Sequence, residues 1–146
     1  MLGLQMDVPL LISDLIAYAA RYHGGRAIAA RDVDGSIHRT TYAELEVRSK
    51  RLANALGTLG IGLGDRVSSL AWNTHRHLEL LFAVPGRGAV LHTVNPRLSP
   101  EQVALVINQA NDQILFFDSA TAALAAAVAP KLLTVRAFVF LGMSTL

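Results

Sequence analysis

The chain has 146 residues, enough for one domain that buries roughly 70% of the surface its unfolded form exposes. Apolar residues make up 52% of it and charged residues 16%, against about 25% charged in ordinary globular domains. We therefore expect part of its apolar surface to contact another protein surface rather than water. Thirteen basic and eleven acidic residues are interspersed, which excludes the clustered positive charge of a nucleic-acid binder. The absence of cysteine excludes disulfides, thiolate metal sites and cysteine nucleophiles.

The apolar runs are too short for a transmembrane segment. Runs such as AALAAAVA, residues 122–129, fall well below the roughly 20 residues that a helix needs to cross a bilayer. The start, MLGLQMDVPLLISDLI, has neither a basic leading segment nor a small-residue cleavage site, so a secretory signal is not expected. These features predict a cytoplasmic protein.

The amino-terminal part predicts an extended tail, a helix and a hairpin. After a tail at residues 1–10, the segment 10–25 carries apolar residues at helical spacing and ends in a glycine pair. Two short apolar stretches then flank Asp34-Gly35, a pair that tolerates the positive φ of a tight turn. A small antiparallel hairpin is therefore predicted at 27–39.

A long helix is predicted to follow Thr41. Thr41 and Glu44 have the spacing of a capping box, in which each side chain satisfies an unpaired backbone amide of the other residue. Apolar residues then recur along one stripe of the helix. On its other faces we expect two ion pairs at i,i+4 spacing, Glu44 with Arg48 and Glu46 with Lys50.

Residues 66–141 alternate between apolar strands and helices. Strands are predicted at 66–72, 89–94, 113–118 and 135–141, with helices at 74–84, 99–110 and 121–131. This alternation predicts an α/β fold with a mostly parallel sheet, right-handed crossovers and helices on both faces. No repeat or linker interrupts the chain, so residues 1–146 are expected to form a single domain.

Several patterns typical of catalytic sites are not fulfilled. Gly60, Gly62 and Gly64 follow a helix and precede a strand, the reverse of a dinucleotide fingerprint, so we expect a helix end and a loop. A phosphate-binding GxxxxGK[ST] loop is absent. Ser68 and Ser69 lie inside a predicted strand without a GxSxG elbow. No catalytic apparatus is recognisable from these motifs.

The histidines do not form a pattern of metal ligands. His75 and His77 are two residues apart near a helix start, so their side chains diverge, and we expect them to be solvated or to cap the helix. His23, His38 and His92 lie far apart, and no carboxylate spacing completes a ligand set. We predict no metal site.

Polar residues gather where the predicted strands end. In open parallel sheets, ligands bind at the carboxyl ends of strands, where loops leave and helix amino termini begin. These ends lie at residues 72–74, 92–97 and 118–119. Because Ser99 has the pattern of an N-cap for the next helix, the exposed part of the middle loop is 92–98. Two interpretations stay open: a ligand site, or an ordinary turn beside a solvated arginine.

Residues 41–102, from TYAELEVRSK to NPRLSPEQ, resemble the amino-terminal region of the AMP-forming acyl-CoA synthetases of the adenylate-forming ligase superfamily. GDRV at 64–67, AWN followed by HLE, and GAVLHTVNPRL at 88–98 are most similar to medium- and long-chain fatty-acid CoA ligases. The tail at 1–24 is similar to the same subgroup. The resemblance covers nearly the whole chain, but only the opening portion of such an enzyme.

The resemblance implies that the catalytic residues lie elsewhere in the complete enzyme. The family's phosphate loop, its adenine contacts and its mobile carboxy-terminal domain all lie downstream of the residues present here. In the family, the equivalent of the loop after the second strand of the parallel sheet borders the channel through which CoA approaches. The implied cofactor-binding candidates are therefore Asn95, Pro96, Arg97 and Leu98, at the edge of that channel.

The resemblance thus predicts the amino-terminal fragment of a fatty-acid CoA ligase, a partial domain of a larger enzyme. The complete enzyme would use ATP, Mg²⁺ and CoA to convert a fatty acid into an acyl adenylate and then a thioester. The fragment alone is expected to be inactive, to bind none of these tightly, and to form a homodimer or higher oligomer through exposed apolar surface. The alternative is a stand-alone oligomerisation or ligand-binding module derived from the family. The ending FVFLGMSTL, directly after a strand, favours a truncated enzyme.

Overall fold

The computed structural model describes residue 3 and residues 7–142, so the predicted tail lies partly, and the last four residues wholly, outside the described residues. In chain order the elements are α1 (Ile12–His23), β1 (Ala27–Arg31), β2 (Ile37–Thr41), α2 (Tyr42–Thr58), β3 (Arg66–Leu70), α3 (His75–Gly86), β4 (Val90–Thr93), α4 (Pro100–Ala110), β5 (Ile114–Phe117), α5 (Ala122–Val128), a 3₁₀ turn η1 (Ala129–Lys131) and β6 (Ala137–Phe140). These elements occupy the segments expected from the hydrophobic pattern.

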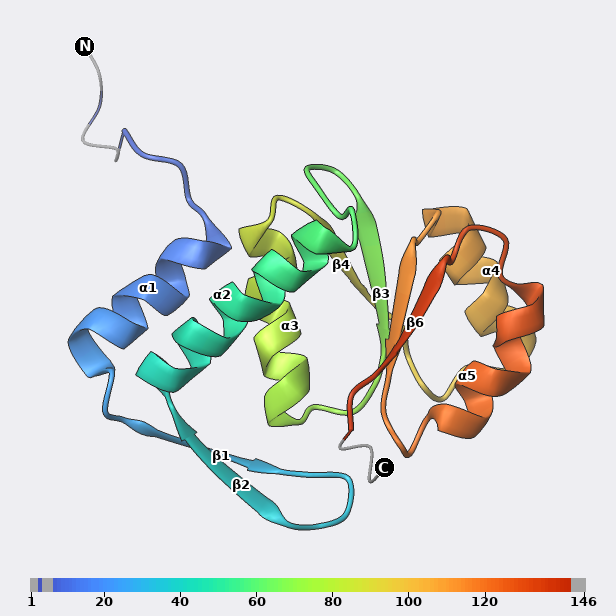
Figure 1. Ribbon diagram of the computed structural model, residues 1–146, viewed down its shortest axis with the longest axis horizontal. Coiled ribbons are helices and arrows are strands. Elements are labelled where there is room, and N and C mark those ends of the chain that lie inside the picture. The colour runs from blue at the N-terminus through green and yellow to red at the C-terminus, as the bar shows by residue number, and fades with distance from the viewer. Residues whose placement is uncertain (1–2, 4–6, 143–146) are drawn as a thin grey trace.

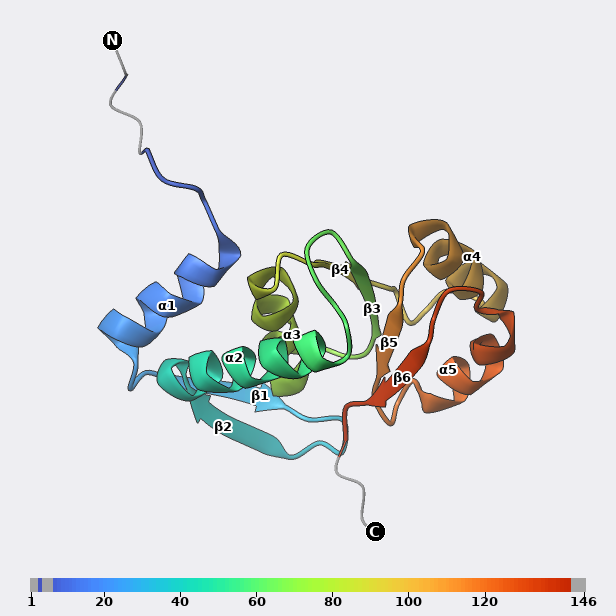
Figure 2. The same ribbon diagram turned by 45° about the horizontal axis from the view of Figure 1, so that its top comes forward.

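The predicted α/β fold is confirmed. Four strands form a parallel sheet in the order β4-β3-β5-β6, while β1 and β2 pair separately as an antiparallel hairpin. Helices α2 and α3 lie on one side of the sheet and α4 and α5 on the other (Figure 1). The hairpin lies next to α2 and α3, and α1 packs on the same pair of helices (Figure 2).

The core has two halves because strand side chains alternate between the faces of the sheet. On one face, Val67 and Phe116 pack with residues of α2 and α3; on the other, Leu70 and Leu115 pack with residues of α4 and α5. The helix residues that complete the two halves include Leu56, Leu80, Ala83 and Val84 on the first face and Val103, Ile107, Ala125 and Val128 on the second. The sheet is therefore buried on both faces, and its loops leave at the edges.

The predicted cap of α2 is confirmed. The Glu44 backbone N–H donates to Thr41 Oγ1 at 3.3 Å, and the Thr41 backbone N–H donates to Glu44 Oε2 at 2.9 Å. At the other end, Gly60 has a φ of +74°, which only glycine adopts without strain, and the chain then passes through the predicted glycine loop into β3.

Of the two ion pairs expected on α2, one is confirmed and one is wrong. Lys50 Nζ lies 2.7 Å from Glu46 Oε1, as predicted. The carboxylate of Glu44 is engaged in the cap instead, and Arg48 pairs with Glu79 of α3. The predicted pair does not form because Glu44 bonds within the cap and Arg48 bonds to the neighbouring helix.

Apolar side chains are exposed on α1. Leu15, Tyr18 and Tyr22 share the outer side of this helix, while Ile16 is buried against the rest of the molecule. Within the described residues, no helix combines the length and apolarity that crossing a bilayer requires.

Candidate functional site at the strand-exit edge

The ends of β3 and β4 enclose a pocket of about 310 Å³, named here the strand-exit pocket. Its lining comprises Ser69, Ala71, Trp72, Asn73, His77, Thr93, Val94, Asn95, Pro96 and Arg97. Three of the four predicted site residues, Asn95, Pro96 and Arg97, are in this lining. The fourth, Leu98, packs against the core beside α4. Two of the three predicted strand ends therefore meet at one site.

The mouth of the strand-exit pocket carries a cation beside an aromatic ring. The guanidinium carbon of Arg97 lies 5.8 Å from the centre of the Trp72 ring. The Arg97 backbone N–H donates to Asn95 Oδ1 at 2.9 Å, which fixes the turn that presents the arginine. The turn interpretation and the ligand interpretation are thus compatible, because the turn places Arg97 at the pocket.

The third predicted strand end, at residues 118–119, includes hydrogen bonds to the backbone at the exit of β3. Asp118, which is buried after β5, accepts a hydrogen bond from the Trp72 N–H at 2.7 Å. Thr121 Oγ1 donates to the carbonyl of Leu70 at 2.5 Å. These bonds tie the exit of β3 to the start of α5, so this strand end supports the pocket without lining it.

A buried serine–histidine pair lies in the lining of the strand-exit pocket. Ser69 Oγ on β3 is 3.0 Å from Nε2 of His77, in the first turn of α3. The two residues are 1% and 7% exposed. The expectation that His77 is solvated or a cap is therefore wrong. The connection from β3 to α3 is short, so the first turn of α3 lies close to the end of β3. The length of this connection is the feature of the sequence from which the contact could have been predicted.

Burial lowers the pKa of His77, and the attraction of Asp118 for its charged form opposes that effect. The imidazole is consequently neutral at pH 7, and a neutral imidazole has one nitrogen able to accept a proton. Of the described residues that line the pocket, His77 is the one with an imidazole side chain.

His92, the first residue of the predicted site segment 92–97, is not part of the pocket lining. Its Nδ1 lies 2.7 Å from Oδ2 of Asp112, a fully buried residue that precedes β5. Burial raises the pKa of Asp112, while its hydrogen bond to His92 acts in the opposite direction. This pair lies outside the lining of the strand-exit pocket.

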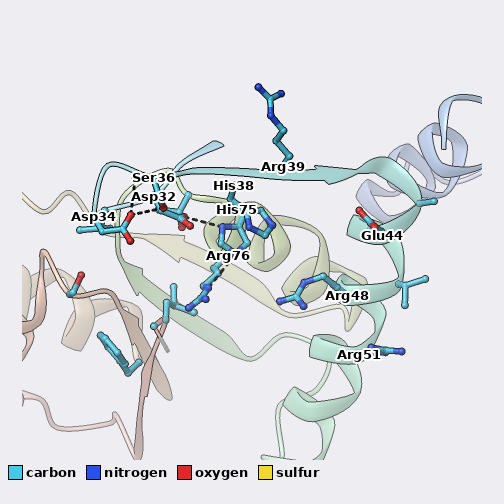
Figure 3. A pocket seen from close by; sticks show the side chains of 18 residues that line it. Asp32, Asp34, Ser36, His38, Arg39, Glu44, Arg48, Arg51, His75 and Arg76 are labelled. Carbon is cyan, nitrogen blue, oxygen red and sulfur yellow. Dashed lines mark hydrogen bonds and ion pairs between the residues drawn. The ribbon is translucent and has the colours of Figure 1, made fainter. Parts of the chain in front are cut away.

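A second, larger cleft of about 1040 Å³ lies between the hairpin, α2, the start of α3 and the end of β6 (Figure 3). The ligand atoms of Asp32, His38 and His75 lie within 4.8 Å of one another there. The two imidazole rings are stacked, 3.6 Å apart and 16° from parallel. His75 Nδ1 bonds Asp32 Oδ1 at 3.0 Å, and Arg76 Nε donates to His75 Nε2 at 3.3 Å.

This arrangement differs from a metal-ligand set. The nitrogens of stacked rings lie in parallel planes, whereas two ligands of one ion must point at a common centre. One nitrogen of His75 is also taken by a guanidinium. We interpret the cluster as a contact that fastens the hairpin to α3. The burial of His75 lowers its pKa, and the expectation that this residue is solvated or a cap is wrong, because the hairpin covers it.

Comparison with known proteins identifies the family. A family model described as AMP-binding enzyme matches residues 16–142. The chain belongs to the AMP-binding enzyme family. The resemblance expected from the sequence motifs is thereby confirmed.

The relatives of this chain include acyl-CoA ligases. It is 47% identical over 142 residues to the 3-methylmercaptopropionyl-CoA ligase of Ruegeria lacuscaerulensis, covering 97% of the chain and 26% of that protein. It is 48% identical over 134 residues to the long-chain-fatty-acid–CoA ligase of Thermus thermophilus, covering 92% of the chain and 25% of that protein. The chain therefore spans about a quarter of the length of these curated relatives.

Solved structures share its architecture. A protein of Rhodopseudomonas palustris assigned as a long-chain-fatty-acid CoA ligase superposes with a TM-score of 0.80 at 30% identity, covering 92% of this chain and 33% of that one. The fatty acyl CoA synthetase of Mycobacterium tuberculosis gives a TM-score of 0.78 at 23% identity, covering 89% and 26%, and shows the fold alone. The chain thus has the fold of one region of these larger proteins.

Proposed function

We propose that this chain is the amino-terminal portion of an AMP-forming fatty-acid CoA ligase. The complete protein would join a fatty acid to ATP, release pyrophosphate, and transfer the acyl group from the adenylate to CoA. The observation that carries this proposal is the match of 92–97% of the chain to acyl-CoA ligases that are 47–48% identical to it. The cytoplasmic location expected from the sequence belongs to the same proposal.

The strand-exit pocket fits the arm of CoA. Its walls include Ala71, Trp72, Val94 and Pro96, which suit an uncharged, extended chain, and Arg97 supplies a cation at the mouth for a phosphate. We assign Asn95, Pro96 and Arg97 to the edge of this channel. No residue of this chain is assigned to ATP or Mg²⁺, because the family's motifs for both lie downstream of the region that this chain resembles.

A pyrophosphate-exchange assay tests the proposal. The complete protein should exchange labelled pyrophosphate into ATP only when a fatty acid is present, while the 146-residue chain should show no exchange. Exchange by the chain alone would refute its inactivity as a fragment. Absence of exchange in the complete protein with short, medium and long fatty acids would refute the ligase assignment. In the complete protein, Arg97→Ala should raise the KM for CoA about tenfold and Arg97→Lys less, because lysine keeps the charge.

A second function, a stand-alone oligomerisation or ligand-binding module, is supported by the exposed apolar side of α1, which suits a partner surface. The reading frame separates the two proposals: an in-frame continuation into a phosphate loop favours the ligase, and a native stop codon after Leu146 favours the module. A homodimer through the α1 surface is part of both proposals.

A further inference from the structure

The acyl-transfer step of the proposed ligase needs a proton acceptor. The thiol of CoA must lose its proton to attack, because the thiolate is the nucleophile and a free thiol of pKa about 8.5 is mostly protonated at pH 7. The leaving group is the phosphate of AMP, which departs as an anion and takes no proton. The single proton released in the step is therefore the one on sulfur, and the question is which group receives it.

The strand-exit pocket contains one group suited to this task. Among its described lining residues, His77 is the one with an imidazole, whose neutral form has a nitrogen able to accept a proton. His77 is buried and neutral, and its Nε2 lies 3.0 Å from the Ser69 hydroxyl, which also lines the pocket. A base and a hydroxyl within hydrogen-bond reach of each other form the arrangement that activates nucleophiles in enzymes.

The direction of the hydrogen bond between Ser69 and His77 depends on the tautomer of the imidazole. Within the described part of the chain, the Ser69 hydroxyl makes a side-chain hydrogen bond to His77 alone. In the His77 tautomer that carries its proton on Nδ1, the Ser69 hydroxyl donates to Nε2. The lone pairs of Oγ are then left to accept a proton from a group that enters the pocket. The neighbouring Ser68 differs, because its hydroxyl donates to the carbonyl of Ile114 inside the sheet.

We propose that the Ser69–His77 pair takes the thiol proton during acyl transfer, an inference that rests on the function proposed above. The S–H proton passes to Ser69 Oγ as the serine gives its own proton to His77 Nε2. The sulfur electron pair forms the C–S bond with the acyl carbonyl, and the C–O bond to phosphate breaks with its electrons on AMP. The imidazolium then returns its proton to water. The charge of Asp118, beyond the end of β5, stabilises this imidazolium.

The surrounding charges shape the pH dependence. The charge of Asp118 acts on His77 from just beyond the end of β5, and Arg97 comes from the loop after β4. His75 and Glu79 lie on α3 itself, where Glu79 is already paired with Arg48 of α2. Burial shifts the pKa of His77 below its ordinary value of 6.5. Acyl transfer should therefore keep its full rate down to a pH below that value and then decline as the imidazole becomes charged.

The test measures the two half-reactions separately in the complete protein. Pyrophosphate exchange without CoA reports adenylate formation, and a single turnover of preformed adenylate with CoA reports acyl transfer. His77→Gln should slow acyl transfer about 100-fold or more and leave exchange within about twofold. Ser69→Ala should slow acyl transfer about tenfold or more, and Ser69→Thr, which keeps the hydroxyl, should restore it to within a few-fold. His23→Gln, on exposed α1, is the matched control and should change neither half-reaction.

The pH profile gives a second readout that a structural role would not change. For His77→Gln the acidic limb should disappear, and the rate should climb with pH as the thiol ionises in solution. Equal losses in both half-reactions, or an unchanged acyl-transfer rate in either Ser69→Ala or His77→Gln, would overturn the inference. If the unsubstituted protein shows no fatty-acid-dependent exchange, the ligase assignment fails first and this inference fails with it.

Discussion

Ser69, His77 and Asp118 are buried polar residues at the carboxyl ends of the sheet, and each has a defined partner. A buried polar group without a partner costs about 1–3 kcal/mol, so such residues persist where their hydrogen bonds are satisfied. Asp118 satisfies backbone N–H groups, whereas Ser69 and His77 satisfy each other beside an open pocket. The first arrangement holds the loops in place, and the second leaves a hydroxyl oxygen available to a ligand.

The buried histidines predict a loss of stability in mild acid. The pKa values of His75 and His77 are lowered from 6.5 by burial, so the unfolded chain binds protons more readily than the folded one. Their contribution to stability is present above pH 6.5 and is lost as the pH falls through the lowered values. Urea denaturation at about pH 7.5 and about pH 5.5 should therefore show a smaller unfolding free energy in acid.

Variants isolate the histidine effect from other groups. His75→Phe keeps an aromatic ring against His38 and should reduce the dependence on pH, while His23→Gln on exposed α1 should leave it unchanged. Asp112 acts with the opposite sign, because its raised pKa gives stability that is lost as the pH rises. The decisive quantity is therefore the difference between variants in how the unfolding free energy changes with pH, and not that change in the unsubstituted chain alone. An identical slope in His75→Phe and the unsubstituted chain would contradict the assignment to His75.

At the scale of elements, α2 and α3 are joined by an ion pair as well as by the core. Arg48 and Glu79 make two hydrogen bonds, and their side chains are 52% and 10% exposed. The hydrogen bond to Glu79 raises the pKa of Arg48 above its ordinary value. Since the carboxylate is nearly buried, it depends on the arginine far more than an exposed carboxylate would.

We predict that Arg48→Ala lowers the unfolding free energy by roughly 1–3 kcal/mol, because a nearly buried carboxylate is left without its partner. The double variant with Glu79→Ala should recover part of that loss, a coupling that a double-mutant cycle measures. Lys50→Ala is the matched control on the same helix. Its exposed pair with Glu46 should contribute at most about 0.5 kcal/mol. Additive effects of Arg48→Ala and Glu79→Ala would show that the pair does not link the helices.

At the scale of the whole molecule, the sheet is covered on both faces and α1 is not covered on its outer side. Leu15, Tyr18 and Tyr22 are exposed there, in keeping with a chain that spans about a quarter of its relatives' length. Apolar patches of this kind tend to be covered by another protein surface. The same surface suits either further parts of a complete ligase or a second copy of the chain.

We predict that the isolated chain self-associates through α1. Sedimentation equilibrium should show a dimer or higher oligomer, and Leu15→Glu combined with Tyr22→Glu should shift it toward the monomer, because buried charge opposes association. Leu63→Glu, at an exposed position in the loop before β3, is the control and should leave the assembly unchanged. A chain that stays monomeric at high concentration would contradict this prediction.

The helices and strands, and their order, could be predicted from local patterns in the sequence. Helical and strand periodicities, the Thr41–Glu44 cap and the glycine loop after α2 depend on neighbours within a few residues, so they can be predicted without the fold. The alternation of strands and helices likewise implied the parallel sheet, and the polar strand ends implied where a site would lie. Three of the four residues named for that site line its pocket.

The side-chain contacts between distant elements could not be predicted from local patterns. The contacts of Ser69 with His77, Arg48 with Glu79, and His75 with the hairpin depend on how elements pack across the molecule. Spacing along the chain does not specify how the elements pack. Local patterns therefore predicted that His77 is solvated or caps its helix, and that Arg48 pairs with Glu44. Burial then altered the chemistry, because removing His77 from water keeps its imidazole neutral beside the pocket.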